Sequence, residues 1–148
     1  MSGSDPREGG CLCGAVRSAA TDVPDHMHAC HCTICRRISG SLTLSVAVPH
    51  SAMRIEGEQH VVTYTSSPWA ARSFCGRCGA GLWYRVTVGD AATADYILSA
   101  GTLDDLSGLV LTQEIYVEMK PDGFALAGDH RRLTGAEFEA TLTDNSEE

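Results

Sequence analysis

Apolar and polar residues alternate with a period of two along several short stretches of the chain. This alternation is typical of β-strands that bury one face. Glycine is frequent, at 15 residues, and favours the tight turns that join short strands. The pattern predicts strands within the ranges 9–18, 26–32, 42–48, 61–65, 71–74, 81–88, 96–100 and 111–118.

Two segments depart from this period. Thr33 is a capping residue and predicts one or two turns of helix over 33–39. A weaker helix is predicted over 137–142, and the acidic end from Asp144 is expected to fray. We therefore expect a flexible N-terminus over 1–8, one mainly β domain over 9–135, and a weak helix with an acidic tail over 136–148.

The composition indicates a soluble protein of a reducing compartment. The first ten residues lack the apolar run of a signal peptide, and no stretch is long enough to span a membrane. We therefore expect a cytoplasmic protein with no membrane partner. In that compartment, seven cysteines indicate metal ligands or catalytic groups, and complete disulfide pairing of an odd number would leave one thiol over.

The net charge of −8 argues against nucleic acid as a partner, because such partners need a basic surface. The charge is unevenly distributed. Residues 17–85 hold seven arginines against four acids, a balance of +3, and include five of the seven cysteines. This stretch suits a small anionic ligand.

The cysteines fall into two pairs and one group of three. Residues two apart on a strand point to the same side, and a Cys-x-x-Cys turn followed by Gly directs both sulfur atoms to one side, as in zinc ribbons. The two remote pairs predict a closed, structural zinc site that ties together a loop of about sixty residues. Its ligands are Cys11, Cys13, Cys75 and Cys78.

The remaining group is Cys30, Cys32 and Cys35. Cys35 falls in the first turn of the predicted helix beside Arg36 and Arg37, where the helix dipole and the arginines favour a thiolate. Three ligands leave a tetrahedral metal one open position, as in catalytic zinc sites. We therefore predict a second, catalytic zinc at these three cysteines.

Other arrangements of this group stay open. His28 shares the face of Cys30 and Cys32 and could be a fourth ligand, whereas His31 points to the opposite face. One cysteine could come from another group. Cys32 and Cys35 could also form a redox pair, although the βαβ setting of such pairs is missing.

At these cysteines the sequence resembles the glutathione-dependent formaldehyde-activating enzyme family, whose zinc domain also occurs in a centromere protein. The resemblance implies a mainly β fold of small antiparallel sheets joined around zinc, similar to the Mss4-like β-tent group, with one short helix after the second cysteine cluster. It also implies two zinc ions per chain, held by the two sets of cysteines given above. The matching strings are GGCLCGAVR from Gly9, CHCTICRR from Cys30 and RSFCGRCG from Arg72, and the similarity spans about 9–117.

The activity that names this family is the condensation of formaldehyde with glutathione. The resemblance therefore implies a zinc-dependent carbon–sulfur lyase-type enzyme, which adds a thiol such as glutathione to formaldehyde or a related small carbonyl. Arg36 and Arg37 are candidates to bind glutathione carboxylates, with a solvated helix face as the alternative. The competing function is a non-enzymatic zinc domain that binds a protein or senses redox state.

The sequence departs from the family toward its end. Gln113-Glu114 and Phe124 stand where relatives tend to show a His and a Trp. We expect the remaining candidates to be structural: aromatic core for Trp69 and Trp83, a turn or helix start for the acidic pair, and surface or packing positions for three histidines. These last residues are Asp104, Asp105, His50, His60 and His130.

Overall fold

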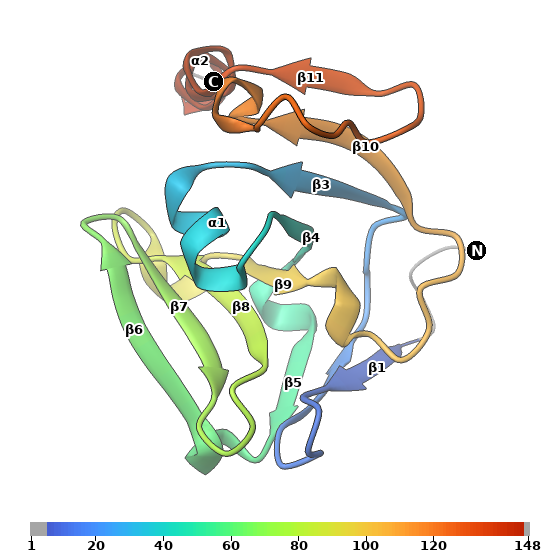
Figure 1. Cartoon of the computed structure of the whole chain (residues 1–148). Helices are drawn as coiled ribbons and strands as arrows, with labels where there is room; N and C mark the ends of the chain where they lie inside the picture. Colours follow the sequence, from blue (N-terminus) through green and yellow to red (C-terminus); the bar gives the residue numbers. More distant parts are fainter. Residues whose placement is uncertain (1–5, 147–148) are drawn as a thin grey trace. The chain divides into compact units, whose positions relative to one another are not determined.

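In the computed structural model, which describes residues 6–146, the chain forms two compact units (Figure 1). Unit 1 contains the chain up to Asp25 and Ser45–Leu109. Unit 2 contains His26–Leu44 and the chain from Val110 onward. The boundaries between these units lie within 9–135, and the single domain expected over that range stays a prediction.

Unit 1 is built from two antiparallel sheets. The first has the strand order β1-β2-β5, with bounds Arg7–Gly10, Arg17–Ala20 and Met53–Glu56. The second has the order β4-β9-β8-β7-β6, with bounds Thr43–Val48, Tyr96–Ser99, Gly81–Val86, Ala70–Cys75 and Val61–Ser67. The first two residues of β4 fall in unit 2, and the rest of the strand falls in unit 1. The described part of unit 1 also contains the 3₁₀ turns η1 His50–Ala52, η2 Glu58–His60, η3 Ala91–Thr93 and η4 Ala100–Thr102.

Aliphatic side chains from neighbouring strands form the core of unit 1. Val46 on β4 lies opposite Leu98 on β9, and both are fully buried. Cross-strand apolar pairs of this kind stabilise a sheet through the area that they remove from water. Trp83 is buried as expected, whereas Trp69 is 55% exposed and does not belong to the core.

Unit 2 contains a small parallel sheet and two helices. Its strands β3, β10 and β11 are His26–Cys30, Val110–Ile115 and Arg131–Leu133, and β10 lies between the other two. A further 3₁₀ turn, η5, spans Val117–Met119. The helices are α1, Thr33–Ser39, and α2, Gly135–Ser146.

Local residues explain where both helices begin. Cys32 is the N-cap of α1, and Gly40 ends that helix in the left-handed conformation, where glycine is favoured. Before α2, the Thr134 hydroxyl accepts from the Glu137 N–H, and the Glu137 carboxylate accepts from the Thr134 N–H. This reciprocal capping box starts α2 at Gly135, earlier than the sequence analysis placed it.

The mainly β prediction is confirmed, and helix 33–39 forms as predicted. Strands β5 and β11 were not predicted, and neither was the parallel pairing of unit 2. At the N-terminus, residues 1–5 lie outside the described residues, while Arg7 already belongs to β1 and donates to the carbonyl oxygens of Asp105 and Ser107. Helix α2 continues past Asp144 to Ser146, and residues 147–148 are outside the described part.

Among the described residues, none of the helices combines the length and the apolar character that a bilayer-spanning helix requires.

Candidate metal centres

The first cysteine cluster lies in unit 1 and brings together residues from two distant turns. Cys11 and Cys13 lie in the turn between β1 and β2, Cys75 is the last residue of β7, and Cys78 lies in the turn between β7 and β8. The four Sγ atoms all lie within 4.8 Å of one another. The structure therefore joins the two pairs that the sequence analysis assigned to one site.

Two sulfur–sulfur distances test whether this cluster fits a metal. The Cys11 and Cys13 Sγ atoms are 3.7 Å apart, and the Cys13 and Cys75 Sγ atoms are 3.8 Å apart. A tetrahedral zinc with bonds of about 2.3 Å separates its sulfur ligands by about 3.8 Å, whereas a disulfide bond is about 2.0 Å long. All seven cysteines are free thiols. The spacing and the donor set fit a bound zinc ion.

Each turn of this cluster places a glycine of positive φ directly after its second cysteine. In the first, the Gly14 N–H donates to the Cys11 carbonyl oxygen at 3.3 Å, and in the second the Gly79 N–H donates to the Cys75 carbonyl oxygen at 2.8 Å. Both glycines have a φ of +82°, a conformation that side chains disfavour. This shared geometry turns the sulfur atoms of each pair to the same side.

Backbone N–H groups and neighbouring sulfur atoms set the protonation of this cluster. Burial raises the pKa of Cys11, but the Val16 N–H, 3.3 Å from its Sγ, and the other sulfur atoms lower that pKa to about 6. The Ala15 N–H lowers the pKa of Cys13, yet burial and the three neighbouring sulfur atoms raise it to about 11. Four thiolates at this spacing repel one another, so a cation is needed to hold all four deprotonated.

The second cluster lies in unit 2, where β3 ends and α1 begins. The Sγ atoms of Cys30, Cys32 and Cys35 lie within 4.8 Å of one another, and neither His28 nor His31 belongs to this group of atoms. The Cys35 N–H donates to the Cys32 Sγ at 3.4 Å. The short distances between these sulfur atoms follow from the local fold. Cys30 is the last residue of β3, Cys32 is the N-cap of α1, and Cys35 lies in the first turn of that helix.

Cys30 and Cys35 are buried, while Cys32 is half-buried and gives the cluster its more accessible side. The sulfur atoms of Cys32 and Cys35, followed by burial, raise the pKa of the Cys30 thiol. A bound cation would reverse this effect, since it favours the thiolate form of its ligands. Three soft sulfur donors fit zinc and leave room for one further ligand.

The walls of this second cluster come from the C-terminal part of the chain. Ile115 is buried against Cys30 and Cys35, and Tyr116, Leu133 and Phe138 pack around them together with Cys32. Tyr116 has a φ of +58°, and its hydroxyl donates to the Glu139 carboxylate at 2.6 Å. The region in which the sequence departs from the family that it resembles therefore forms part of the cluster's surroundings.

Arg36 and Arg37 lie on the exposed side of α1. Within the described residues, neither side chain forms a hydrogen bond or an ion pair. Both remain available to bind an anionic group, and their role in substrate binding stays a prediction.

The sequence analysis missed a buried carboxylate behind the second cluster. Glu114 on β10 is 1% exposed, and its Oε1 accepts from the His31 Nε2 at 2.7 Å. Its Oε2 accepts from the His130 Nε2 at 2.5 Å and lies 3.3 Å from the Arg132 Nε. Burial raises the pKa of Glu114, but the hydrogen bonds from His130 and His31 outweigh burial and lower it.

This arrangement changes the interpretation of two histidines. His31 turns away from the sulfur atoms, as expected, and is held by Glu114. His130, which we expected at the surface or in packing, has a side chain only 1% exposed and forms a hydrogen bond with Glu114. The sequence did contain one signal of this buried carboxylate: Glu114 is a charged residue next to a buried position of a predicted strand.

Comparisons with known proteins give a consistent set of relatives. The family described as "Glutathione-dependent formaldehyde-activating enzyme" matches residues 6–119. An uncharacterized lyase of Schizosaccharomyces pombe is 28% identical over 127 residues, covering 86% of this chain and 90% of the relative. A putative glutathione-dependent formaldehyde-activating enzyme of Halomonas elongata is 32% identical over 85 residues, covering 51% of this chain and 54% of the relative.

One solved structure shares the fold. The crystal structure of a Rhodobacter sphaeroides protein matches with a TM-score of 0.51 and 22% sequence identity. The match covers 71% of this chain and 99% of that chain. At this level of identity, the likeness concerns the fold alone.

Proposed function

The chain belongs to the glutathione-dependent formaldehyde-activating enzyme family, and from this premise we propose that it is a zinc-dependent carbon–sulfur lyase. The proposed reaction adds a thiol such as glutathione to formaldehyde or a related small carbonyl. The observation that carries the proposal is the cluster of Cys30, Cys32 and Cys35, which offers three sulfur ligands and an accessible side at Cys32.

The two clusters have different proposed roles. Cys11, Cys13, Cys75 and Cys78 complete a tetrahedron by themselves, so we assign them a structural zinc. Cys30, Cys32 and Cys35 leave one position open, so we assign them the zinc of the reaction. Such an ion, when bound, polarises a carbonyl or favours the thiolate form of a substrate thiol.

The proposed reaction is balanced without an oxidant or a reductant. A bond forms between the thiol sulfur and the carbonyl carbon, and the carbonyl π bond breaks. The thiol proton ends on the former carbonyl oxygen, which becomes the hydroxyl of a hydroxymethyl thioether. The reverse step breaks the same carbon–sulfur bond, which makes the enzyme a lyase in that direction.

The chain's own residues contribute binding and exclusion of water. Ile115, Tyr116, Leu133 and Phe138 surround the sulfur atoms with apolar surface and limit the access of solvent. Arg36 and Arg37 carry the positive charge that the carboxylates of glutathione would require. The seven free cysteines need a reducing compartment, so we propose that the protein acts in the cytoplasm with a small thiol as its partner.

NMR exchange spectroscopy tests the proposal directly. The zinc-loaded protein should accelerate exchange between free formaldehyde and its glutathione adduct, while Cys32→Ser and Cys35→Ser should remove this acceleration and keep the fold of unit 1. The matched control is Ser41→Ala, an exposed change close to α1 that alters no cysteine, and it should retain full activity. Exchange at wild-type rates in both cysteine variants contradicts the proposal.

The second candidate function is a non-enzymatic zinc domain that binds a protein or senses redox state. It uses the same cysteines and predicts no acceleration of the exchange with any small thiol. Wild-type protein that carries two zinc ions and leaves the exchange rate unchanged would favour this function.

A further inference from the structure

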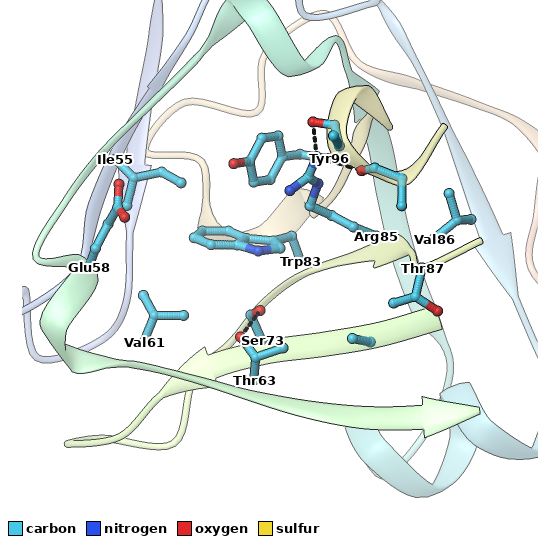
Figure 2. Close-up of a pocket in the computed structure, with 13 residues that line it drawn as sticks. Ile55, Glu58, Val61, Thr63, Ser73, Trp83, Arg85, Val86, Thr87 and Tyr96 are labelled. Atoms are coloured by element: carbon cyan, nitrogen blue, oxygen red, sulfur yellow. Dashed lines mark hydrogen bonds between the residues drawn. The ribbon is translucent and has the colours of Figure 1, made fainter. Parts of the chain in front are cut away.

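We propose that unit 1 contains a binding site for a small aromatic carboxylate, in a cavity that none of the seven cysteines lines. The cavity has a volume of about 550 Å³, within the usual range of small-molecule sites. Figure 2 shows the side chains that surround it. The proposal is independent of the lyase activity and concerns a separate set of residues.

The floor of the cavity is one face of strands β6, β7 and β8. Thr63 pairs with Ser73, and Ser73 pairs with Trp83, so these residues form one row across the three strands. Ala71 and Arg85 pair in the row two residues further along. Because side chains alternate along a strand, both rows face the same side of the sheet.

The floor and walls provide a slot with aromatic and aliphatic surfaces. The Tyr96 ring stands edge-on to the Trp83 indole, with centroids 5.3 Å apart and an interplanar angle of 87°. Ile55 and Val61 add aliphatic surface at the end of the cavity near Glu58 (Figure 2). This slot suits an aromatic ligand, because a ligand ring can stack on one of the Trp83 and Tyr96 rings and contact the edge of the other.

Arg85 places a fixed positive charge at one end of this slot. Its guanidinium lies 4.5 Å from the centroid of the Tyr96 ring. The Nη2 atom donates to the His50 Nδ1 and to the Ala94 carbonyl oxygen, both at 3.0 Å, and lies 3.3 Å from the carbonyl oxygens of Ala91 and Ala92. These contacts fix the guanidinium in place before any ligand binds.

The same guanidinium has a donor that the protein does not use. The Arg85 Nε atom is buried and has no hydrogen-bond partner, and within the described residues no carboxylate pairs with this arginine. The solvent-inaccessible Nε does not reach a ligand, but the positive charge of the guanidinium is left without an anion among the described residues and attracts a carboxylate in the cavity. Glu58 lies across the cavity from Arg85 (Figure 2), so a ligand carboxylate is expected at the arginine end.

Binding of three matched probes to the zinc-loaded full chain tests the proposal. The chain has two tryptophans, so Trp69→Phe leaves Trp83 as the only fluorescent indole. Benzoate should bind with a Kd of about 1 mM and shift both the fluorescence and the indole N–H signal of Trp83. Benzamide and benzylammonium should bind at least tenfold more weakly, because only the carboxylate neutralises Arg85. Equal binding of the three probes, or an unshifted Trp83 signal, overturns the proposal.

Two variants and a control locate the site. Arg85→Gln should weaken benzoate binding at least tenfold. Because Arg85 also holds η3, a second variant, Ala71→Leu, fills the floor and leaves the arginine in place; it should weaken binding to the same degree. The control Arg54→Gln removes an exposed arginine that does not line the cavity and should leave affinity unchanged. Wild-type affinity in both cavity variants overturns the proposal. If either variant unfolds, the affinities of benzoate, benzamide and benzylammonium for the protein that keeps Arg85 decide the question.

Discussion

The Sγ atom of Cys13 lies 3.8 Å from the Sγ atom of Cys75, although the two residues are 62 positions apart in the chain. This distance equals the separation of sulfur ligands around a tetrahedral zinc, about 3.8 Å for bonds of about 2.3 Å. The contact connects the turn after β1 with the turn after β7. A metal at this point would therefore act as a cross-link within unit 1.

The first prediction concerns the stability of that cross-link. Closing a loop of this length contributes about 4 kcal/mol by the loop-entropy relation used for covalent cross-links. Cys75→Ser should lower the free energy of unfolding by about that amount, and urea unfolding measured by circular dichroism would show it. Cys32→Ser is the matched control, because the second cluster spans only a few residues and should cost much less. Equal losses in the two variants would contradict the assignment of a structural role to the first site.

The second prediction concerns metal content. Native mass spectrometry of freshly reduced protein should show two zinc ions per chain. Cys35→Ser should retain one ion, held by the four-cysteine cluster. Ageing in air should remove the ion of the three-cysteine cluster first, because an open site with a half-buried Cys32 is more accessible to oxidants. Finding no more than one zinc ion in the reduced wild-type chain would contradict the proposal of two zinc sites.

Local patterns explain how much of the cysteine arrangement could be predicted. The spacing of Cys11 and Cys13 and the knuckle at Cys75 are properties of a few neighbouring residues, and so is the helix that starts after Cys32. The pairing of Glu114 with His31 depends on the parallel register of β10 and β3. Most of unit 1 lies between those two strands in the sequence, so no local pattern could reveal their pairing.

The cavity in unit 1 shows the same limit. The sequence predicted Trp83 as core, and the residue is buried, yet its indole also forms part of a floor that needs three strands in register. The sequence analysis could not assign a role to Arg85, because its hydrogen-bond partners His50 and Ala94 come from separate turns. Predicting strands from the sequence places such residues on strands, but it does not show which residues of different strands lie in one row.

The third prediction concerns the buried carboxylate of Glu114. Glu114→Gln removes the carboxylate that accepts from His31 and His130 and lies 3.3 Å from the Arg132 Nε, and it places an amide donor against one of the two histidines. Loss of one partner from a buried ion pair destabilises a protein by about 3 kcal/mol or more. Thermal and urea unfolding should show this loss in unit 2, whereas the control Gln113→Ala should stay within about 0.5 kcal/mol of wild type. A Glu114→Gln protein as stable as the control would contradict a stabilising role for the buried carboxylate.

The same carboxylate predicts a dependence on pH. The folded protein holds the pKa of Glu114 below its ordinary value of 4.5. Its stabilising contribution is therefore complete above about pH 4.5 and is lost as the pH falls through the lowered folded pKa. The difference in unfolding free energy between wild type and Glu114→Gln should narrow as the pH falls below about 4.5. A difference in unfolding free energy that grows below pH 4.5 would contradict a lowered pKa of Glu114 in the folded protein.

The last prediction concerns Gly57, which lies against the first zinc turn. It has a φ of +83°, and a Cβ atom added there would stand 1.9 Å from the Ala15 carbonyl oxygen, a backbone atom that cannot move aside alone. Gly57→Ala should therefore displace the 11–16 turn, lower the free energy of unfolding by about 2 kcal/mol or more, and speed the release of zinc to a chelator. Gly89→Ala is the control: its φ is +66°, but no atom lies within 4 Å of the added Cβ, so only the backbone strain of about 1 kcal/mol applies. If both variants release zinc at the wild-type rate, the close approach of Gly57 to Ala15 does not support the metal site.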